Sequence, residues 1–567
     1  MENKLSGARV LLESLVASGV DTVFGYPGGA IMPLYDALYD YKSKLHHILV
    51  RHEQAAVHAA QGYARATGRT GVCFVTSGPG ATNTVTGVAD AMMDSTPLVV
   101  ITGQVVSQGL GFDSFQETNI VGITHPITKW NTLVRRAEDL PAAIAKALFI
   151  ANTGRPGPVL IDITKDAQLG LVEWSGYEPC QSIRSYRPCP KADGEDIIKA
   201  ARLIDTASKP MILFGQGVTL SGAESELKEF IEKSGIPAAA TLLGLSALDG
   251  ENPHYIGMIG MHGNYAANVT NEECDLIVAV GMRFDDRVTC NASVFAKNAK
   301  VIHIDIDQAE IDKVIPTTVG IVGDAKEVLA SLTRQITKKE HTAWLERMHE
   351  YNREEYSLVV APFKGDGTGE ILLHHVVEAV NDSYNGENIT VTDVGQHQMV
   401  TCRYIKLANP RSNITSGGLG TMGFGLPAAM GAKIGAPDKE VILFVGDGGI
   451  QMNIQEFATI MQEKTAVKVI ILNNSWLGMV RQWQELFHDC RYSFTSMMNP
   501  KYDLIAQAHD IEYGVCDKRE DLAQAISAMK SCEGAYILEV RVKPEDNVFP
   551  MVAPVAALKD VIFEMKK

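Results

Sequence analysis

The fold is decided by two neighbouring stretches, VILFVGDGG at residues 441–449 and VKVIILNN at residues 467–474. Each begins with a β-branched run typical of a buried strand and ends in Gly, Asp or Asn. A strand, a helix and a second parallel strand take about thirty residues, and the carboxyl ends of parallel strands converge on one crevice. Asp447 and Asn474 are therefore predicted to meet at the ligand site of an open α/β sheet.

These residues suit a hard divalent cation. Asp447 and Asn474 offer the oxygen ligands that Mg²⁺ prefers, and a main-chain carbonyl with a diphosphate would complete a near-octahedral set. Gly446, Gly448 and Gly449 leave room for phosphate beside the backbone. GDG or NN alone is typical of a turn. Together, each after a buried-strand run, they favour a metal-diphosphate clamp.

The same alternation of strand-like runs, Gly-rich turns and helical periodicity recurs along all 567 residues. It predicts the α/β class, with three doubly wound parallel-sheet domains of roughly 150 residues or more each. Two segments interrupt the pattern, the Pro-containing residues 172–192 and the charged residues 336–368, and both are predicted to be linkers. We expect domains at residues 1–180, 190–340 and 365–567.

Composition excludes several classes of protein. With 46% hydrophobic and 21% charged residues, the chain is neither disordered nor collagen-like. A net charge of −16 disfavours nucleic acid or an anionic membrane as a partner. The 9 cysteines lack any CxxC, so neither a disulfide framework nor a zinc site is indicated. No apolar run reaches the roughly eighteen residues of a membrane span and no signal peptide is recognisable, which predicts a cytoplasmic protein.

The GDG and NN motifs resemble the cofactor signature of thiamine diphosphate (ThDP) enzymes. In that family the residues that match Asp447 and Asn474 hold Mg²⁺, together with the main-chain oxygen of the residue that matches Trp476. The blocks GYPGGAIMPLYDAL at 25–38 and TSGPGATNTVTGVADAMMDSTPLVVITGQ at 76–104 match the amino-terminal half of the family. The resemblance implies ThDP and Mg²⁺ as cofactors.

Glu53 opens a predicted helix in the segment RHEQAAVHAAQGYARATG. A favourable interaction with the helix dipole would by itself explain an acidic residue there. The resemblance instead places Glu53 on the catalytic glutamate, a carboxyl that exchanges a proton with the aminopyrimidine of ThDP. In the family this glutamate and the metal clamp come from different subunits, which implies a homodimer or homotetramer.

The block TSGGLGTMGFGLPAA at 415–429 contains a GxGxxG motif, but no acidic residue closes a strand about twenty positions later, so nicotinamide binding is not predicted. In the family this segment lies along ThDP, and the residue that matches Met422 packs under the cofactor. The resemblance implies further ThDP contacts from the matched blocks: Gly28, Gly29, Gly395, Gln396, His397, Gly420, Gly446, Gly448, Gly449 and Met479.

The run GMRFDDRV at 281–288 follows the strand-like DLIVAV. A solvated charge cluster is one interpretation. The other is half of a nucleotide site, because VIHIDID further on also ends in acidic residues. The RFDDR motif is similar to that of the FAD-containing acetohydroxyacid synthases among ThDP enzymes. That resemblance implies FAD, held by Arg155, Gly215, Gly217, Thr241, Leu242, Met261, His262, Gly281, Arg283, Asp285, Arg287, Asp305 and Asp324.

The resemblance also implies the reaction. Pyruvate is decarboxylated and the two-carbon unit joins a second pyruvate, giving 2-acetolactate, or 2-oxobutyrate, giving 2-aceto-2-hydroxybutyrate, in branched-chain amino-acid biosynthesis. Core packing would explain Met479 and Trp483, four apart on a predicted helix, but their family counterparts line the acceptor pocket, and Trp483 implies a preference for 2-oxobutyrate. Gln116 and Lys165 match polar residues of that pocket, and Arg287 is a candidate for holding the acceptor carboxylate.

Two alternatives stay open at this stage. One is another ThDP enzyme: a catabolic acetolactate synthase, a glyoxylate carboligase, a pyruvate oxidase or an oxalyl-CoA decarboxylase. RFDDR disfavours the catabolic synthase, and Glu53 disfavours the carboligase. The other is a non-catalytic paralogue that serves as a binding or regulatory subunit, which the intact Glu53, Asp447 and Asn474 disfavour. Any feedback control is expected from a separate regulatory small subunit.

Overall fold

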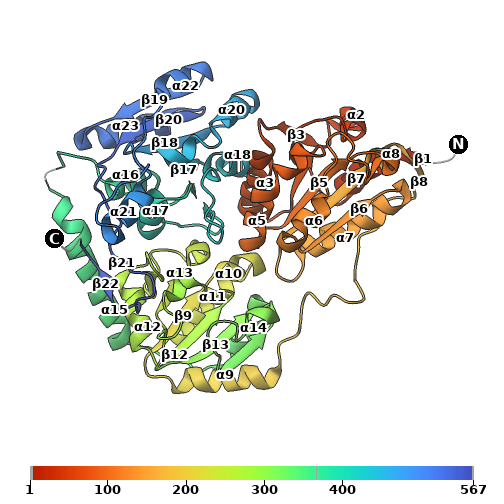
Figure 1. Ribbon diagram of the computed structural model, residues 1–567. Coiled ribbons are helices and arrows are strands. Elements are labelled where there is room, and N and C mark those ends of the chain that lie inside the picture. Colours follow the sequence, from red (N-terminus) through yellow and green to blue (C-terminus); the bar gives the residue numbers. More distant parts are fainter. Residues whose placement is uncertain (1–3, 366, 565–567) are drawn as a thin grey trace.

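The computed structural model describes residues 4–365 and 367–564, which form three α/β domains (Figure 1). Each domain is built on a six-stranded sheet. Within these sheets every strand pair is parallel. The predicted α/β class with three parallel-sheet domains is confirmed.

The amino-terminal sheet has the order β3-β2-β4-β5-β7-β6. Its central strands are buried along their whole length, as expected when helices cover both faces of a parallel sheet. The strands are β2 (Thr22–Gly25), β3 (His46–Leu49), β4 (Gly71–Val75), β5 (Leu98–Gln104), β6 (Trp130–Val134) and β7 (Pro158–Thr164). The helices are α1 (Gly7–Ala17), α2 (Met32–Leu38), α3 (Glu53–Thr67), α4 (Pro79–Thr82), α5 (Val85–Met93), α6 (Ile120–Thr124), α7 (Leu140–Asn152) and α8 (Lys165–Leu169).

The middle sheet has the order β11-β10-β9-β12-β13-β14. Its strands are β9 (Pro210–Phe214), β10 (Ala238–Ala240), β11 (Tyr255–Met258), β12 (Leu276–Val280), β13 (Lys300–Asp305) and β14 (Val319–Val322). Its helices are α9 (Gly194–Thr206), α10 (Gln216–Ser221), α11 (Glu224–Ser234), α12 (Tyr265–Glu273), α13 (Asp286–Thr289) and α14 (Ala325–Gln335). The strand order reverses between β9 and β12, and such a switch point is where open α/β sheets bind ligands.

The carboxyl-terminal sheet has the order β16-β15-β17-β18-β20-β19, with its switch point between β15 and β17. Its strands are β15 (Ile389–Thr392), β16 (Asn413–Thr415), β17 (Val441–Gly446), β18 (Val467–Asn473), β19 (Glu512–Cys516) and β20 (Tyr536–Arg541). Its helices are α16 (Leu373–Tyr384), α17 (Gln396–Tyr404), α18 (Gly425–Gly435), α19 (Asp447–Ile450), α20 (Phe457–Glu463), α21 (Gly478–Phe487), α22 (Tyr502–Ala508) and α23 (Leu522–Ser531).

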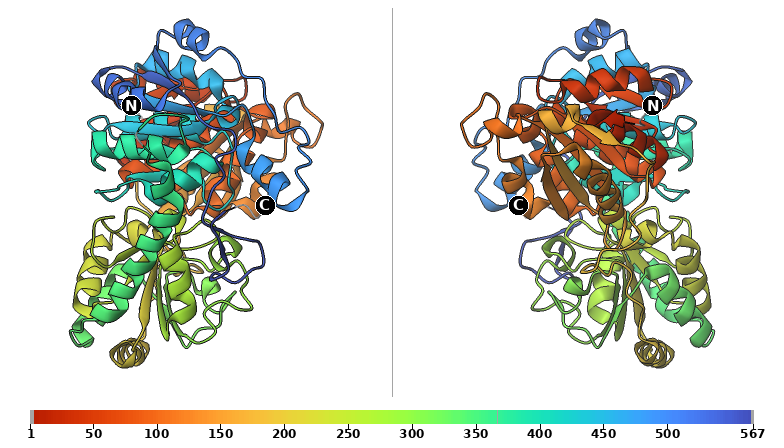
Figure 2. Two further views of the ribbon diagram at one scale, coloured as in Figure 1. Left: turned by 90° about the vertical axis from the view of Figure 1, so that its left-hand side faces the viewer. Right: turned by 90° about the vertical axis from the view of Figure 1, so that its right-hand side faces the viewer.

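Two connections and a tail join these domains. After β8 (Leu171–Glu173), which pairs with β1 (Lys4–Ser6), the chain runs without helix or strand to α9. The helix α15 (Thr342–Glu355) then leads from the middle domain to the carboxyl-terminal domain (Figure 2). The tail strands β21 (Met551–Val552) and β22 (Val561–Ile562) return to the middle domain, where Val552 N donates to Met261 O at 2.8 Å. Within the described ranges no helix has the length and apolar character that a membrane crossing requires.

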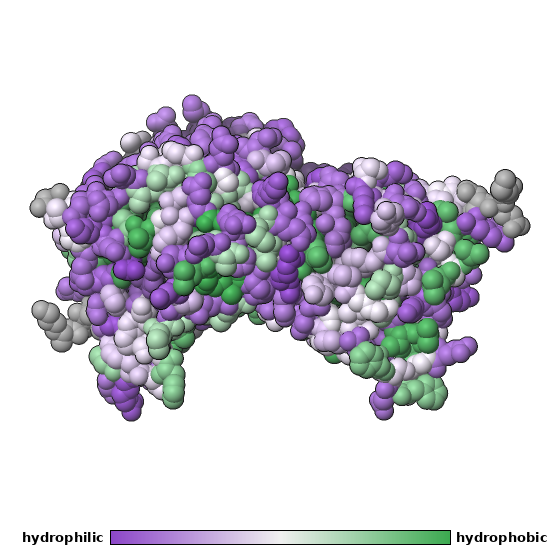
Figure 3. Space-filling model, turned by 90° about the horizontal axis from the view of Figure 1, so that it is seen from above, coloured by the Kyte–Doolittle hydropathy of each residue, from purple (hydrophilic) through white to green (hydrophobic). Residues whose placement is uncertain are grey.

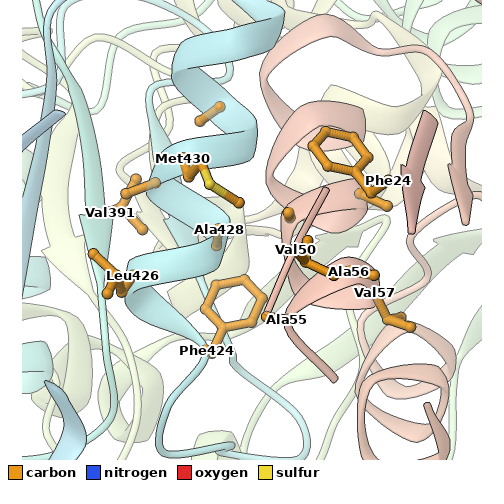
Figure 4. Close-up of a cluster of buried hydrophobic side chains, with 14 of the residues drawn as sticks. Phe24, Val50, Ala55, Ala56, Val57, Val391, Phe424, Leu426, Ala428 and Met430 are labelled. Atoms are coloured by element: carbon orange, nitrogen blue, oxygen red, sulfur yellow. The ribbon is translucent and has the colours of Figure 1, made fainter. Parts of the chain in front are cut away.

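The amino- and carboxyl-terminal domains share one hydrophobic core. Helices α3 and α18 lie side by side, with Ala55, Ala56, Phe424 and Met430 among the side chains at their contact (Figure 4). A single cluster of buried residues extends across this contact into both sheets. The two domains therefore behave as one packed body at this contact, although α3 and α18 are more than three hundred residues apart in the sequence.

Candidate active site

The predicted clamp lies at the carboxyl ends of β17 and β18, which are paired along their whole length. Asp447 and Asn474 follow these adjacent strand ends. Asp447 is buried, and Asn499 Nδ2 donates to Asp447 Oδ2 at 2.7 Å and to Asn473 Oδ1 at 2.9 Å. The two ends of the motif, separated by α19 and α20 in the sequence, are thus bridged by a third segment.

The donor set of the clamp fits Mg²⁺ with a diphosphate. Burial raises the pKa of Asp447 above its ordinary value, and a bound cation would reverse that effect. Trp476 N donates to Asn474 Oδ1 at 3.0 Å, so one tight turn presents the Asn474 amide and the Trp476 carbonyl. Among the described residues no group of three or more His, Cys, Asp or Glu side chains could hold a metal. A magnesium ion here would therefore need diphosphate or water oxygens as well.

Asp393, which the sequence analysis missed, organises the loop before α18. It follows β15 at the switch point, and its carboxylate accepts the N–H of Gly423 at 3.0 Å and of Gly425 at 2.8 Å. Burial raises the pKa of Asp393 to about 6. A Cβ at Gly448 would lie 3.6 Å from Met422 Cε, so this loop lays Met422 against the clamp. The available signal was a polar residue directly after the buried run ITVT.

Other predicted ThDP contacts also lie at the clamp. A Cβ at Gly446 would lie 3.1 Å from His397 Nδ1, and a Cβ at Gly478 would lie 2.1 Å from Gln396 Oε1 and 2.9 Å from Asn474 Nδ2. The amino terminus of α17 therefore meets the turn that follows β18. Glycine at both positions lets these side chains approach the backbone closely.

A cavity of about 650 Å³ opens between the three domains. This volume is in the range of cofactor pockets, about 300 to 1,000 Å³. Twelve of the thirteen residues predicted to contact FAD line it, all except Gly215. Gly215 packs directly against Gly281, which does line the cavity: a Cβ at Gly215 would be 2.5 Å from Gly281 O. Gly395, Gly420, Met479 and Trp483 line the same cavity, so it reaches the clamp.

The charged residues of the cavity have defined partners rather than free solvation. Arg155 forms ion pairs with Glu310 at 2.7 Å and Asp307 at 3.4 Å. Asp285 accepts the first free N–H groups of α13, and Asp324 does the same for α14. Burial raises the pKa of Asp305 to about 6. The acidic residues are thus used partly as helix caps, a role that the sequence analysis did not assign.

Among the cavity-lining residues, His262 has a buried ring nitrogen without a hydrogen-bond partner in the described part of the chain. Burial, reinforced by the neighbouring guanidinium groups of Arg403 and Arg287, lowers the pKa of His262 to about 3. His262 Nδ1 is buried without a hydrogen-bond partner in the described part of the chain. His262 lines the cavity, and its unpartnered neutral nitrogen lies enclosed within the cavity wall.

A second group of predicted residues gathers elsewhere, at the carboxyl ends of β2 and β4. Glu53 begins α3 after the strand β3, is half-buried, and accepts Asn83 Nδ2 at 2.9 Å. A Cβ at Gly28 would lie 2.5 Å from Thr76, and one at Gly78 would lie 2.9 Å from Gln116 Cβ. Each of these contacts is internal to the amino-terminal domain.

Gly29 and Lys165 belong to the same edge of that sheet. Gly29 precedes α2 and has open space where a Cβ would be, and the half-buried Lys165 begins α8 after β7. Neither lines the large cavity. The predicted residues therefore fall into an amino-terminal group and a carboxyl-terminal group that adjoins the cavity.

Comparison with known families matches each domain in turn. Residues 5–123 match the model of the thiamine pyrophosphate enzyme N-terminal TPP binding domain, residues 197–332 the central domain, and residues 393–540 the C-terminal TPP binding domain. Thiamine pyrophosphate, or TPP, is another name for ThDP.

Relatives match over almost the full length of both chains. The chain is 43% identical over 563 residues to the acetolactate synthase isozyme 2 large subunit of Escherichia coli (strain K12), covering 98% of this chain and 99% of that one. It is 43% identical to the acetolactate synthase large subunit of Lactococcus lactis subsp. lactis (strain IL1403), with 97% and 95% covered. It is 46% identical to that of Parasynechococcus marenigrum (strain WH8102), with 97% and 90% covered.

The chain belongs to the acetolactate synthase large-subunit family of thiamine pyrophosphate enzymes. This confirms the resemblance drawn from GDG, NN and RFDDR. Asn499, which donates to Asp447 at the clamp, was also missed by the sequence analysis. It lies in a segment without helix or strand after α21, and no local pattern marks it.

Proposed function

We propose that the chain decarboxylates pyruvate and joins the two-carbon unit to a second pyruvate or to 2-oxobutyrate. The products are 2-acetolactate and 2-aceto-2-hydroxybutyrate, the first common step of valine, leucine and isoleucine biosynthesis in the cytoplasm. The observation that carries the proposal is the junction of clamp and cavity. Helix α21 begins just after Asn474 and Trp476, and its Met479 and Trp483 line the cavity.

ThDP and Mg²⁺ are the cofactors proposed for the clamp. Asp447, Asn474 and the main-chain oxygen of Trp476 would hold the metal, and the buried position of Asp447 supports this assignment. When bound, ThDP supplies the electron sink for decarboxylation. The chain's own part is to hold the two 2-oxo acids together, which can lower a barrier by about 7 to 11 kcal/mol in the best intramolecular cases.

FAD is the proposed occupant of the cavity. Supporting features are the predicted flavin contacts that line the cavity and the close backbone contact of the switch-point loops, where a Cβ at Gly217 would lie 2.6 Å from Gly281 Cα. Glycine at these positions lets a nucleotide approach the backbone. The proposed reaction involves no net redox change, so FAD serves as a structural ligand.

The acceptor site is proposed to lie where α21 meets the cavity. Met479 and Trp483 are one helical turn apart, and the Trp483 ring packs on Phe487 at 5.3 Å between centroids. The extra methylene of 2-oxobutyrate packing on this indole would favour that acceptor by about 1 to 3 kcal/mol. Arg287, whose side chain is 61% exposed and lies 3.7 Å from Asp286, is proposed to bind the acceptor carboxylate bidentately.

A second copy of the chain is proposed to complete each site. Glu53 would exchange a proton at its carboxyl oxygen with the cofactor bound by the clamp of that copy, with Gln116 and Lys165 from the same edge of the sheet. Large hydrophobic side chains are exposed on loops of both outer domains, at 78% for Phe112, 87% for Phe115 and 99% for Phe494. Such side chains mark surfaces that associate.

The shape of the molecule supports this second partner. Viewed from above, two lobes project on one side with a hollow between them, and hydrophobic residues reach the surface of both lobes (Figure 3). A homodimer or homotetramer would bury them. A regulatory small subunit is proposed as a further partner, because the relatives are named large subunits.

The test is an assay of the purified chain with pyruvate, ThDP and Mg²⁺, with and without FAD, together with its oligomeric state. We expect acetolactate from an oligomer that retains FAD. Glu53→Gln is expected to lower the rate at least a hundredfold, the scale of a lost general acid–base group, while Glu138→Gln, an exposed acidic residue of the same domain, leaves it unchanged.

The alternatives have distinct outcomes in this assay. Acetate or acetyl phosphate in place of acetolactate would indicate a pyruvate oxidase. Full activity without bound FAD would indicate a catabolic synthase, and no product from the intact oligomer would indicate a non-catalytic paralogue. Unchanged acetolactate formation by Glu53→Gln would refute the role of Glu53.

A further inference from the structure

The loop from Ser416 to Met422 connects β16 to α18 and faces both cofactor sites. Ser416, Gly417, Gly418 and Gly420 line the cavity. Met422, at the other end of the loop, lies against the clamp. The position of this one loop therefore affects both sites.

This loop is held by two carboxylates from another domain. Asp94, the residue after α5, accepts the backbone N–H of Gly417 at 2.9 Å and of Gly418 at 2.6 Å. Asp90, one turn earlier, accepts the hydroxyl of Thr421 at 2.7 Å and the hydroxyl of Ser416. Asp94 thus holds Gly417 and Gly418 beside the cavity, and Asp90 ties together Ser416 and Thr421 at the two ends of the loop.

Burial makes these bonds strong. Asp90 and Asp94 are 0% and 1% exposed. The guanidinium of Arg65 on α3 pairs with Asp94 at 2.8 Å and also donates to Thr96 Oγ1 at 3.2 Å. Because Asp94 pairs with Arg65, its bonds to the loop are charge-assisted and stronger in this dry site than in water. Asp90 Oδ2 has no hydrogen-bond partner among the described residues, so this carboxyl depends on the hydroxyls of Ser416 and Thr421, which both bond its other oxygen.

The loop is tightly packed at Gly418. A Cβ at Gly418 would lie 3.0 Å from Asp94 Oδ1, 3.0 Å from Met93 Cβ and 3.1 Å from Arg283 Nη2. At Gly418 the loop therefore packs closely against the end of α5 and against an arginine of the cavity. The position of the loop relative to both sites therefore depends on where α5 places the carboxylates of Asp90 and Asp94.

We propose that Asp90 and Asp94 are positioning residues that align the Ser416–Met422 loop with the ThDP and FAD sites of their own chain. This inference rests on the proposed function and deepens it. The amino-terminal domain then serves two sites at once: Glu53 acts in the site of a second copy, while Asp90 and Asp94 shape the site of the same copy.

The test compares the two ends of the loop by direct cofactor binding. ThDP with Mg²⁺ is titrated calorimetrically into the flavin-loaded chain, and FAD binding to the apoprotein is followed by flavin fluorescence. We expect Asp94→Asn to weaken FAD binding at least tenfold, about 1.4 kcal/mol, and ThDP binding less. We expect Thr421→Val, which removes one hydroxyl from Asp90, to weaken ThDP binding more than FAD binding.

Controls separate positioning from general destabilisation. Thr421→Ser keeps the hydroxyl and is expected to restore ThDP binding. Asp21→Asn alters an exposed ion pair with Arg69 in the same domain and should change neither affinity. If each variant loses affinity for both cofactors in proportion to the decrease in its melting temperature, the positioning role is overturned.

Two further outcomes distinguish this inference from the proposed function. If the wild-type chain binds both cofactors and makes acetolactate while Asp94→Asn and Thr421→Val bind them unchanged, the inference alone fails. If the wild-type chain binds neither cofactor, the proposed function fails, and the inference fails with it.

Discussion

The carboxyl-terminal domain contacts its two neighbours in opposite ways. Against the amino-terminal domain, the backbones of α3 and α18 touch: a Cβ at Gly62 would lie 2.0 Å from Ala428 O, and one at Gly431 would lie 1.8 Å from Ala59 O. Against the middle domain lies the 650 Å³ cavity, bordered by polar contacts such as Arg411 Nη2 to Thr219 O at 2.8 Å.

The two contacts differ in how far the domains on either side can shift relative to each other. Close-packed helices tolerate almost no change in separation, because interiors are packed like crystals. A contact made of long polar side chains around a cavity can shift by small rotations of those side chains. The contact between α3 and α18, which we call the dry contact, fixes the clamp relative to α5. The contact with the middle domain, which we call the open contact, leaves space for a large ligand.

The largest expected effect tests the dry contact. Gly431→Val would place side-chain atoms where the α3 backbone lies, and we expect a loss of about 3 kcal/mol or more of stability from overpacking. Thermal unfolding of the purified chain measures it. The control is Gly194→Val at the exposed start of α9, where a Cβ would meet no atom within 4 Å. Equal melting temperatures for the two variants would contradict a close-packed contact.

The second prediction uses pH to probe the same contact. His58 packs edge-on against Phe424, and burial lowers its pKa from 6.5 to about 3. The unfolded chain then binds a proton below pH 6.5 that the folded chain does not, so stability falls as pH falls through 6.5. At about 1.4 kcal/mol per unit, the loss by pH 5 is about 2 kcal/mol.

Replacing His58 isolates this contribution from other histidines. In His58→Gln the melting temperature is expected to fall less steeply between pH 6.5 and 5 than in the wild type. The exposed His488→Gln is the matched control, with a wild-type slope. Identical slopes in the His58→Gln variant and the wild type would show that the ring is hydrated, which contradicts a dry contact.

The third prediction concerns the open contact. The buried Arg403 donates to the carbonyl of His262 at 2.6 Å and to those of Phe549 and Pro550 at 2.7 Å. Arg403→Met would leave these carbonyls without donors and is expected to cost about 1 to 2 kcal/mol. Melting temperature and FAD retention after gel filtration measure it. Arg136→Met, an exposed partner of Asp139, is the control.

The smallest expected effect is at the edge of the cavity. Asn413 Nδ2 donates to Leu242 O at 3.1 Å across the open contact. Asn413→Ala is expected to cost about 1 kcal/mol, less than any change at the α3–α18 contact. Asn409→Ala, which removes a bond to Glu387 within the carboxyl-terminal domain, is the control for the melting measurement. A decrease in melting temperature for Asn413→Ala as large as that for Gly431→Val would contradict a difference in packing between the two contacts.

Much of the carboxyl-terminal site could be predicted because its residues follow strands that pair with each other. Asp447 and Asn474 each end a β-branched run, and the parallel arrangement brings such ends together. For Met479 and Trp483 the helical period alone indicates core packing, and their place at a pocket was predicted from the family resemblance. Asn499 and Asp90 could not be predicted, since their partners come from segments whose separation in the chain carries no signal.

The sequence by itself determined the class of fold and the family, because strand runs, glycine turns and the motifs between them are local patterns. Only the tertiary structure decided that Asp90 and Asp94 reach the loop beside the clamp. That outcome depends on how α3 packs against α18. Such packing follows from complementary side-chain shapes across the whole contact, which no single segment encodes.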